Sequence, residues 1–212
     1  MDQPVWDPES DAPTGIEEAD IALSEQLTTQ RRHPVIQALG AIGELGDQPP
    51  LVAFSAGVLA FGLLSGRGRT AAAGANMLLS LGIAIAAKTA VKKTISRTRP
   101  NVLLDEGTYQ VEPLGPDEGP WHSMPSGHTA GSVAVACALA RTVPEAALPA
   151  YAAATAVAAV QLPTAHHFLS DIVVGAAIGI GADMAAARIA RQAQKLLDGQ
   201  FEADGEAGPE PG

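Results

Sequence analysis

The chain has 212 residues, of which 47% are hydrophobic and 4% aromatic, and its formal net charge is −10. Thirteen of the 23 acidic residues, and none of the 13 basic ones, lie in residues 1–25 and 198–212, so the part between them is slightly basic. This length predicts one domain, and the charge pattern does not favour nucleic-acid binding.

The two ends of the chain are rich in Asp, Glu, Gly and Pro, which is typical of solvated and disordered segments. We therefore predict disordered acidic tails at residues 1–15 and 198–212 and a folded domain over residues 16–197. Early in this domain, apolar residues recur at helical spacing and predict an amphipathic helix on a membrane surface or over a bundle. They are Val35, Ile36, Leu39, Ile42 and Leu45.

Five later segments are apolar and almost free of charge. They cover residues 50–66, 70–91, 128–141, 145–161 and 170–188. At ~1.5 Å per residue, the first two are long enough to span or nearly span a ~30 Å hydrocarbon core. The third and fourth are short, so each alone also fits a buried helix of a soluble bundle. We predict an all-α, polytopic membrane helix bundle with about five transmembrane helices, in which Gly175 and Gly179 permit close helix packing.

The second apolar segment leads into the fragment KKTISRTRP, residues 92–100. If the helix continues through it, Lys92 and Arg99 lie two turns apart on nearly the same face, and Pro100 ends the helix. A guanidinium suits bidentate phosphate contact, and a lysine adds a compact charge. Alone, such cations also fit a polar boundary next to an apolar helix.

The fragment PSGH, residues 125–128, precedes the third apolar segment. Ser126 is a favourable N-cap residue, so a helix should begin after it. The free N–H groups of that helix start would attract an anion, and Gly127 leaves room for its close approach. An ordinary capped helix start is the alternative.

The fragment HFLSD, residues 167–171, begins the fifth segment. On a helix, His167 and Asp171 would share one face, so the carboxylate could accept a hydrogen bond from one ring nitrogen and leave the other free as a nucleophile. A structural His–Asp pair is the alternative.

In order and spacing, the three fragments resemble the signature motifs of the type 2 phosphatidic acid phosphatase (PAP2) superfamily, K-x6-R-P, P-S-G-H and S-R-x5-H-x3-D. The resemblance covers roughly residues 49–190. It implies that His167 is the nucleophile that forms a phosphohistidine, that Asp171 orients it, and that His128 protonates the leaving group and then activates water. It also implies a set of phosphate-binding residues and no metal or other cofactor. They are Lys92, Arg99, Ser126, Gly127 and Gln161.

One position departs from the family pattern. Counting back from His167, the Ser-Arg pair of the third motif falls on Val160 and Gln161, so the arginine is absent. Loss of a charged contact to a buried phosphate costs roughly 2–4 kcal/mol in the transition state. Either a nearby cation such as Arg97 or Lys93 compensates, or the enzyme is slow, or the protein only binds phosphate groups.

Five crossings would bring all three motifs to the same membrane face. The opposite face would carry basic residues that the positive-inside rule assigns to the cytoplasm, so the site would face outward from a bacterial inner or plasma membrane. These residues are Arg67, Arg69, Arg141, Arg188, Arg191 and Lys195.

The predicted function is that of a membrane phosphatase acting on a lipid-linked phosphomonoester or pyrophosphate, of the phosphatidate, phosphatidylglycerophosphate or polyprenyl phosphate type. The main alternative is a catalytically weak or silent relative that binds phospholipid head groups, for which Gln161 is the best argument. A soluble phosphatase or a vanadate-dependent haloperoxidase is a third possibility, and the apolar segments disfavour it.

Overall fold

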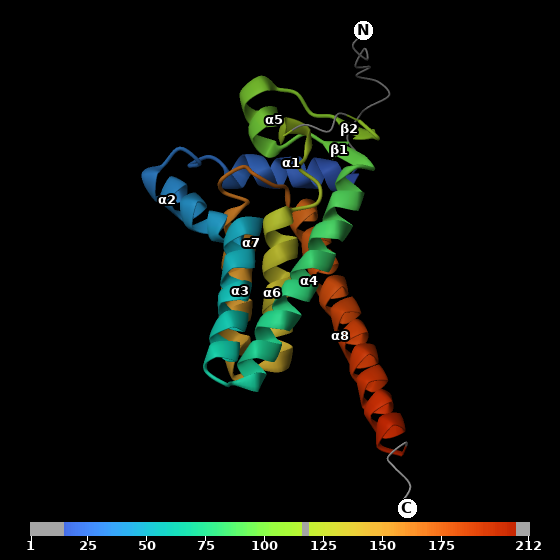
Figure 1. The fold of residues 1–212 in the computed structure, drawn as a ribbon. Helices are drawn as coiled ribbons and strands as arrows, with labels where there is room; N and C mark the ends of the chain where they lie inside the picture. Colours follow the sequence, from blue (N-terminus) through green and yellow to red (C-terminus); the bar gives the residue numbers. More distant parts are fainter. Residues whose placement is uncertain (1–14, 116–118, 207–212) are drawn as a thin grey trace, which may run out of the picture.

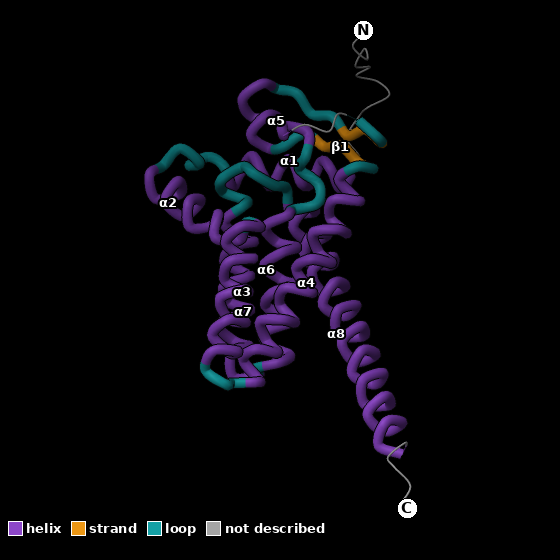
Figure 2. Tube along the Cα trace, in the orientation of Figure 1, coloured by secondary structure: helices purple, strands orange, loops and turns teal. Residues whose placement is uncertain are grey.

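The computed structural model describes residues 15–115 and 119–206, in which five long helices form a bundle that shorter elements cover at one end (Figures 1 and 2). The bundle comprises α3 (Gln48–Leu64), α4 (Gly68–Lys92), α6 (Gly127–Thr142), α7 (Ala147–Val160) and α8 (Leu169–Glu206). The covered end carries α1 (Gly15–Leu27), α2 (Pro34–Gly43), β1 (Ile95–Arg97), α5 (Pro100–Glu106) and β2 (Val111–Pro113). Three short 3-10 helices complete the fold: η1 (Glu44–Gly46), η2 (Gly119–Trp121) and η3 (Pro144–Ala146).

Each of the five predicted apolar segments forms a bundle helix, with bounds close to those predicted. The largest difference lies at the end of α8, which continues to Glu206 and so enters the segment predicted as the C-terminal tail. Residues 1–14 of the predicted N-terminal tail, and residues 207–212, lie outside the described residues.

Two helices of the described part of the chain, α4 and α8, are long and apolar enough to cross a membrane. The segment formed by α2 and η1 makes an angle of 53° with α3. If this bent pair is counted as one span, the number of candidate spans is three. On α3, large apolar side chains are exposed, which suits contact with lipid rather than water. They include Phe54, Phe61, Leu63 and Leu64. The prediction of an all-α membrane bundle is confirmed, with two or three helices meeting the criteria for a span.

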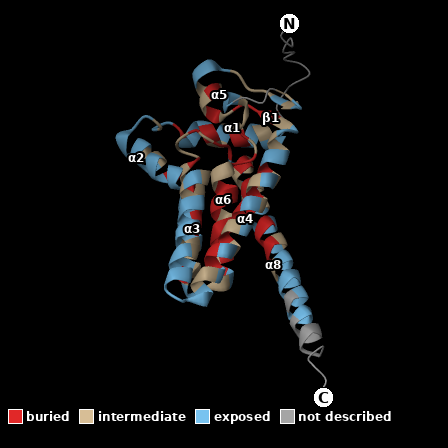
Figure 3. Ribbon diagram, viewed as in Figure 1, coloured by how far each residue is buried: buried red, intermediate tan, exposed pale blue. Residues whose placement is uncertain are grey.

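Small residues bring the helices close together around α6, the most buried helix in Figure 3. A Cβ atom added to Gly175 or Gly179 of α8 would lie 2.7 Å from a backbone oxygen of α6, that of Ser126 or Ala130. The predicted close packing at these two glycines is therefore confirmed. It holds the first turn of α8 beside the first turn of α6, where the Ser126 N–H donates to the Asp171 carbonyl at 3.1 Å.

The fragment KKTISRTRP does not continue the helix, and this part of the prediction is wrong. Helix α4 ends at Lys92, and the chain then forms β1, which pairs with β2. The β-branched and hydroxyl side chains after Lys93 disfavour a helix, and pairing with Val111–Pro113 satisfies the strand's backbone groups. Pro100 begins α5 at its first turn instead of ending α4, and Arg99 is the N-cap residue of α5.

The predicted amphipathic helix is present as α2, which His33 caps by accepting a hydrogen bond from the Val35 N–H. A separate helix, α1, precedes it and lies across the end of the bundle (Figure 1). Asp20 of α1 accepts hydrogen bonds from both the backbone N–H and the hydroxyl of Ser170. The N-terminal region is thus fastened directly to the start of α8.

Candidate active site

The three predicted motifs meet at the covered end of the bundle, where direct contacts join them. Lys92 Nζ donates to the His122 carbonyl at 2.8 Å, in the segment that leads to PSGH. The His167 ring nitrogen Nδ1 lies 2.7 Å from the carbonyl oxygen of Ser123 in the same segment. Residues that are far apart in the sequence therefore surround one small volume, as the predicted topology requires.

His167 is buried just before α8, with 3% of its side chain exposed. Because a carbonyl oxygen can only accept, the contact with Ser123 requires the proton on Nδ1, which leaves Nε2 unprotonated. Nε2 makes no hydrogen bond within the described residues. Burial lowers the pKa of His167 to about 4, although the nearby Asp171 carboxylate acts in the opposite direction. The imidazole is therefore neutral and has a free lone pair at physiological pH.

The sequence predicts a hydrogen bond from His167 to Asp171, and the structure does not contain it. Its Oδ2 lies 3.8 Å from Nδ1, which is too long for a hydrogen bond. The reason is that α8 begins at Leu169, so His167 precedes the helix and is not one turn from Asp171 on the same face. Oδ2 instead accepts from Ser123 Oγ at 2.6 Å and from the Phe168 N–H at 2.8 Å. Asp171 thus holds the two segments that orient the imidazole.

Arg97 completes this network and is not available to a phosphate. One of its terminal nitrogens donates to Asp171 Oδ1 at 2.9 Å and to Ser170 Oγ, and the other donates to Asp20 Oδ2 at 3.0 Å. Its guanidinium also lies over the Phe168 ring, 4.1 Å from the centroid. Arg97 is 3% exposed, so its charge is compensated by two buried carboxylates.

The start of α6 has the capped geometry that the predicted anion cradle at PSGH requires. Ser126 is the N-cap residue, and its side chain accepts from the Thr129 N–H. The N–H groups of Gly127 and His128 make no backbone hydrogen bond within the described residues. Two unused donors at a helix start, together with the helix dipole, favour a phosphate there.

His128 stands opposite His167, with 6.5 Å between the ring centroids. Its Nε2 lies 3.6 Å from Oε2 of Glu44 in η1 and makes no hydrogen bond within the described residues. The proximity of Glu44 to His128 was not predicted. The two residues are 84 positions apart, and no local sequence pattern indicates that they meet.

Arg99 places a second cation of the first motif near these histidines. Burial lowers the pKa of its guanidinium, and the carboxylates of Asp171 and Glu44 act in the opposite direction, so the group remains a cation. Its Nε is buried and has no hydrogen-bond partner among the described residues. Lys92 and Arg99 therefore both reach the site, although they do not share a helix face.

Gln161, the residue that replaces the family arginine, contributes mainly through its backbone. Its carbonyl accepts from the N–H groups of His166 and His167. The side chain is 1% exposed; its Nε2 donates to the Val157 carbonyl at 3.3 Å, and its Oε1 has no partner within the described part of the chain. Of the two cations predicted to compensate, Arg97 is held by carboxylates and Lys93 is exposed.

Several groups around the site were not predicted. Ser123 and Asp20 carry no local signal, because their partners lie 48 and 150 positions away in the chain. The Nδ1 of His166 lies 3.3 Å from Thr164 Oγ1, which fits a structural role for this histidine. Among the described residues, no cluster of three or more His, Cys, Asp or Glu could hold a metal ion.

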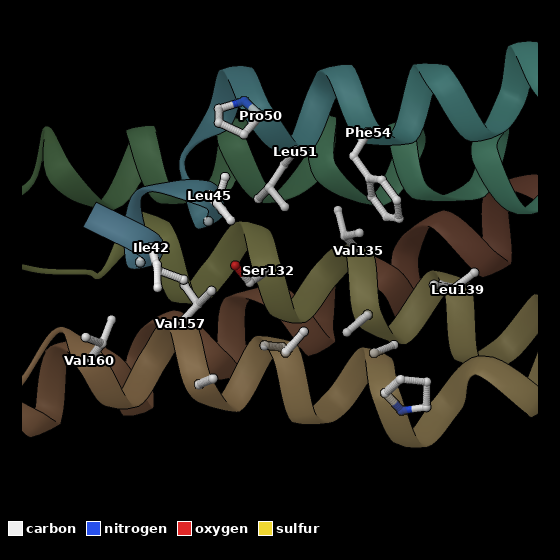
Figure 4. Close-up of a pocket in the computed structure, with 18 of the residues that line it drawn as sticks. Ile42, Leu45, Pro50, Leu51, Phe54, Ser132, Val135, Leu139, Val157 and Val160 are labelled. Atoms are coloured by element: carbon white, nitrogen blue, oxygen red, sulfur yellow. The ribbon is translucent and has the colours of Figure 1, made fainter. Parts of the chain in front are cut away.

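An apolar cavity of about 630 Å³ opens beside the site, between α3, α6 and α7 (Figure 4). Gly43, Leu45 and Gly46, which lie within two residues of Glu44 in the chain, contribute to its lining. Ser132 supplies a hydroxyl in a lining that is otherwise apolar. Leu39 and Ile42 of the predicted amphipathic helix also line it. The cavity thus lies next to the site, since Gly43 and Leu45 flank Glu44 in the chain and Val160 precedes Gln161.

The fold resembles those of two solved membrane proteins. A transmembrane PAP2-type phosphatidylglycerolphosphate phosphatase from Bacillus subtilis matches with a TM-score of 0.60 and 20% identity, over 85% of this chain and 89% of that one. LpxE from Aquifex aeolicus matches with a TM-score of 0.56 and 24% identity, over 79% of this chain and 94% of that one. No curated protein matches the chain in sequence.

The sequence pattern of one family covers more than half of the chain. The model of the PAP2 superfamily matches residues 73–195, a range that contains all three motifs and every candidate site residue given above except Asp20 and Glu44. The two solved structures share the helical membrane fold. The predictions of family, membrane fold and phosphatase class are therefore confirmed, and the chain belongs to the PAP2 superfamily.

Proposed function

We propose that this protein hydrolyses a phosphate ester or pyrophosphate carried by a membrane lipid, through a phosphohistidine at His167. The observation that carries the proposal is the state of His167. Its Nδ1 is fixed by the Ser123 carbonyl, its Nε2 is free, and burial keeps the ring neutral. Lys92 and Arg99 also act on the ring electrostatically, which places two cations near a free nitrogen that a merely structural histidine would not need.

In the first step, Nε2 of His167 attacks phosphorus and the bond to the leaving oxygen breaks. His128, on the opposite side of the site, donates a proton to that oxygen. Lys92 and Arg99, with the N–H groups of Gly127 and His128, stabilise the negative charge on the three phosphoryl oxygens. Ser126 positions these donors by capping α6.

In the second step, His128, now neutral, takes a proton from water, and the resulting hydroxide attacks phosphorus. The N–P bond breaks, inorganic phosphate leaves, and both imidazoles return to their starting state. Asp171 supports both steps indirectly, since it holds Ser123 and Phe168 in place. The steps need no metal ion or other cofactor, and metal independence is part of the proposal.

A lipid substrate is supported by the neighbouring cavity and by the membrane fold. A charged head group would reach the site at the end of the bundle, while a hydrocarbon chain would occupy the apolar cavity (Figure 4). Phosphatidate, phosphatidylglycerophosphate and polyprenyl phosphates or pyrophosphates all meet these requirements. The Bacillus subtilis structure is that of a phosphatidylglycerolphosphate phosphatase, which makes this lipid the first to test.

We also propose that the site faces away from the cytoplasm of a bacterial inner or plasma membrane. Arg67 and Arg69 lie at the α3–α4 turn, and Arg141 lies at the end of α6, which is the end of the bundle opposite the site. Positive residues of this kind favour the cytoplasmic side. Labelling of a cysteine introduced at Leu114, which is exposed on the site side, would test this orientation in intact cells.

The decisive experiment measures phosphate release from a panel of lipid phosphates by the detergent-purified protein in the presence of a metal chelator, with His167→Ala in parallel. We expect release that survives chelation and disappears in the variant, and a ³²P label trapped on His167 at early times. If a folded protein releases phosphate from none of these lipids, the alternative of a head-group-binding protein replaces this proposal. Release that chelation abolishes would contradict the metal-free mechanism.

A further inference from the structure

Lys88 of α4 is a cation at the site that no motif includes. It lies one helical turn before Lys92, and only 8% of the residue is exposed. A Cβ atom built on Gly127 would fall 2.8 Å from Lys88 Nζ and 3.4 Å from its Cδ. The end of the lysine side chain therefore packs directly against the backbone of PSGH, at the start of α6.

The ammonium group has no direct partner in this position. Within the described residues, Lys88 Nζ forms neither an ion pair nor a hydrogen bond, and the Asp47 carboxylate acts on it only through longer-range attraction. A buried charge is costly unless it is paired. A dianionic group bound at the N–H groups of Gly127 and His128 would provide the missing partner, since Nζ packs against the backbone of Gly127.

The position of Lys88 matters because the family arginine is absent at Gln161. The structure commits Arg97 to Asp171 and Asp20, and it leaves Lys93 exposed. Among the described residues, Lys88 is thus a cation beside the cradle, outside the three motifs, that neither a carboxylate nor a carbonyl holds. A larger residue at position 127 would displace the ammonium group, because its Cβ would lie 2.8 Å from Nζ.

We propose that Lys88 binds a phosphoryl oxygen at the start of α6 and supplies the charge that Gln161 does not. The inference rests on the proposed function, because it assigns a further substrate-binding residue to the same site. If it is correct, the phosphate-binding cation lies on α4 instead of at the end of α7. The glutamine at position 161 is then no longer an argument for a catalytically silent protein.

Two readouts test the proposal on the purified full-length protein, and one of them does not depend on turnover. The first is the affinity for orthovanadate, measured from the rise in melting temperature with vanadate concentration. The second is kcat/KM for phosphate release. We expect Lys88→Gln to weaken vanadate binding by about tenfold or more and to lower kcat/KM by roughly 30- to 1000-fold.

Two matched variants control for general effects of charge and folding. Lys93→Gln removes an exposed lysine from the same helix end and should change neither readout by more than about twofold. Lys88→Arg keeps the charge and should recover most of the vanadate affinity. A folded Lys88→Gln protein with unchanged vanadate affinity would overturn the proposal.

Asp47→Asn keeps the proposal testable if Lys88→Gln does not fold. Removal of this carboxylate leaves Lys88 more available to an anion, so vanadate should bind more tightly, by about twofold or more. Unchanged or weaker binding would overturn the role of Lys88. If the wild-type protein releases no phosphate but binds vanadate in a manner that depends on Lys88, the proposed hydrolysis fails while the binding role stands.

Discussion

Two aspartates of α8, Asp171 and Asp183, each pair with an arginine, but at opposite ends of the bundle. Asp183 accepts from both Nε and a terminal nitrogen of Arg141 in α6, and from Ser80 Oγ in α4 at 3.0 Å. Asp171 accepts from Arg97, Ser123 and Phe168, which lie in a strand and in loops. The same ion-pair chemistry therefore fastens helices at one end and loops at the other.

The difference lies in what each cluster leaves unused. Around Asp183, the paired groups belong to three packed helices, and the contacts join these helices to one another. Around Asp171, the contacts hold the Ser123 carbonyl and His167 in place, while the nearby N–H groups of Gly127 and His128 have no backbone partner among the residues that the structure describes. Such a site has free N–H donors and a free imidazole nitrogen next to a carboxylate whose hydrogen bonds are all made. This combination is typical of a ligand-binding or catalytic site.

The largest effect is expected when the Asp171 cluster loses its arginine. Arg97→Gln leaves Asp171 and Asp20 as buried carboxylates without their cation, and breaking such a pair costs about 3–5 kcal/mol. We expect a large drop in the temperature of half-inactivation in detergent and almost complete loss of phosphate release, because the Ser123 and Phe168 segments lose their anchor.

Arg97→Lys is the matched control, since it keeps one charge but cannot bridge both carboxylates. It should recover part of the stability and less of the activity. Wild-type activity in a stable Arg97→Gln protein would show that the network around Asp171 does not orient His167.

A smaller and separable effect is expected at the other end of the bundle. Asp183→Asn weakens the contact with Arg141, whose side chain is 34% exposed and can therefore be solvated in part. We expect stability to fall by about 1–3 kcal/mol, while kcat of the folded protein stays within about twofold of the wild type. A tenfold loss of kcat at unchanged KM would instead show that the two ends are coupled through α8.

The comparison also shows which features a sequence can reveal. The cradle at Ser126 and Gly127 was predictable, because an N-cap residue and a helix start are local signals. The helix bounds were predictable from the apolar runs, and the meeting of the motifs followed from their order along these helices.

Features that depend on distant partners were not predictable. Arg97 resembled the other cations of its fragment, and only the contact with Asp20, from a helix 77 positions earlier, shows that it belongs to a carboxylate network. Lys88 sits within an apolar helix, and its proximity to Gly127 arises from the packing of α4 against α6. The assumed His167–Asp171 hydrogen bond does not form because α8 begins at Leu169, two residues after His167.

A more modest change is expected in the dependence of activity on pH. The nucleophile must be neutral, and burial lowers the pKa of His167 from its usual 6.5 to about 4. At pH 5, about nine-tenths of His167 should still be neutral, compared with a few per cent for an ordinary histidine. The loss of kcat/KM that protonation of the nucleophile causes should therefore appear only below about pH 5.

The measurement is kcat/KM between pH 4 and 8, with the titration of the substrate phosphate determined separately and divided out. Phosphate release that halves near pH 6.5, after this correction, would contradict the burial of His167 as the factor that sets its protonation. The profile of Arg97→Lys provides a comparison within the same cluster.

The smallest effect is expected from Gln161→Arg, which restores the family residue. If Lys88 already supplies the phosphate-binding charge, a second cation adds little, and the rate should change by less than about threefold. In the Lys88→Gln background the same substitution should raise kcat/KM by about tenfold or more, because the charge is then missing. Gln161 is fully buried, so the melting temperature of each variant must be measured with its rate. A large gain in the wild-type background would mean that the arginine position is truly vacant, and the cation relocation that we infer for Lys88 would then be wrong.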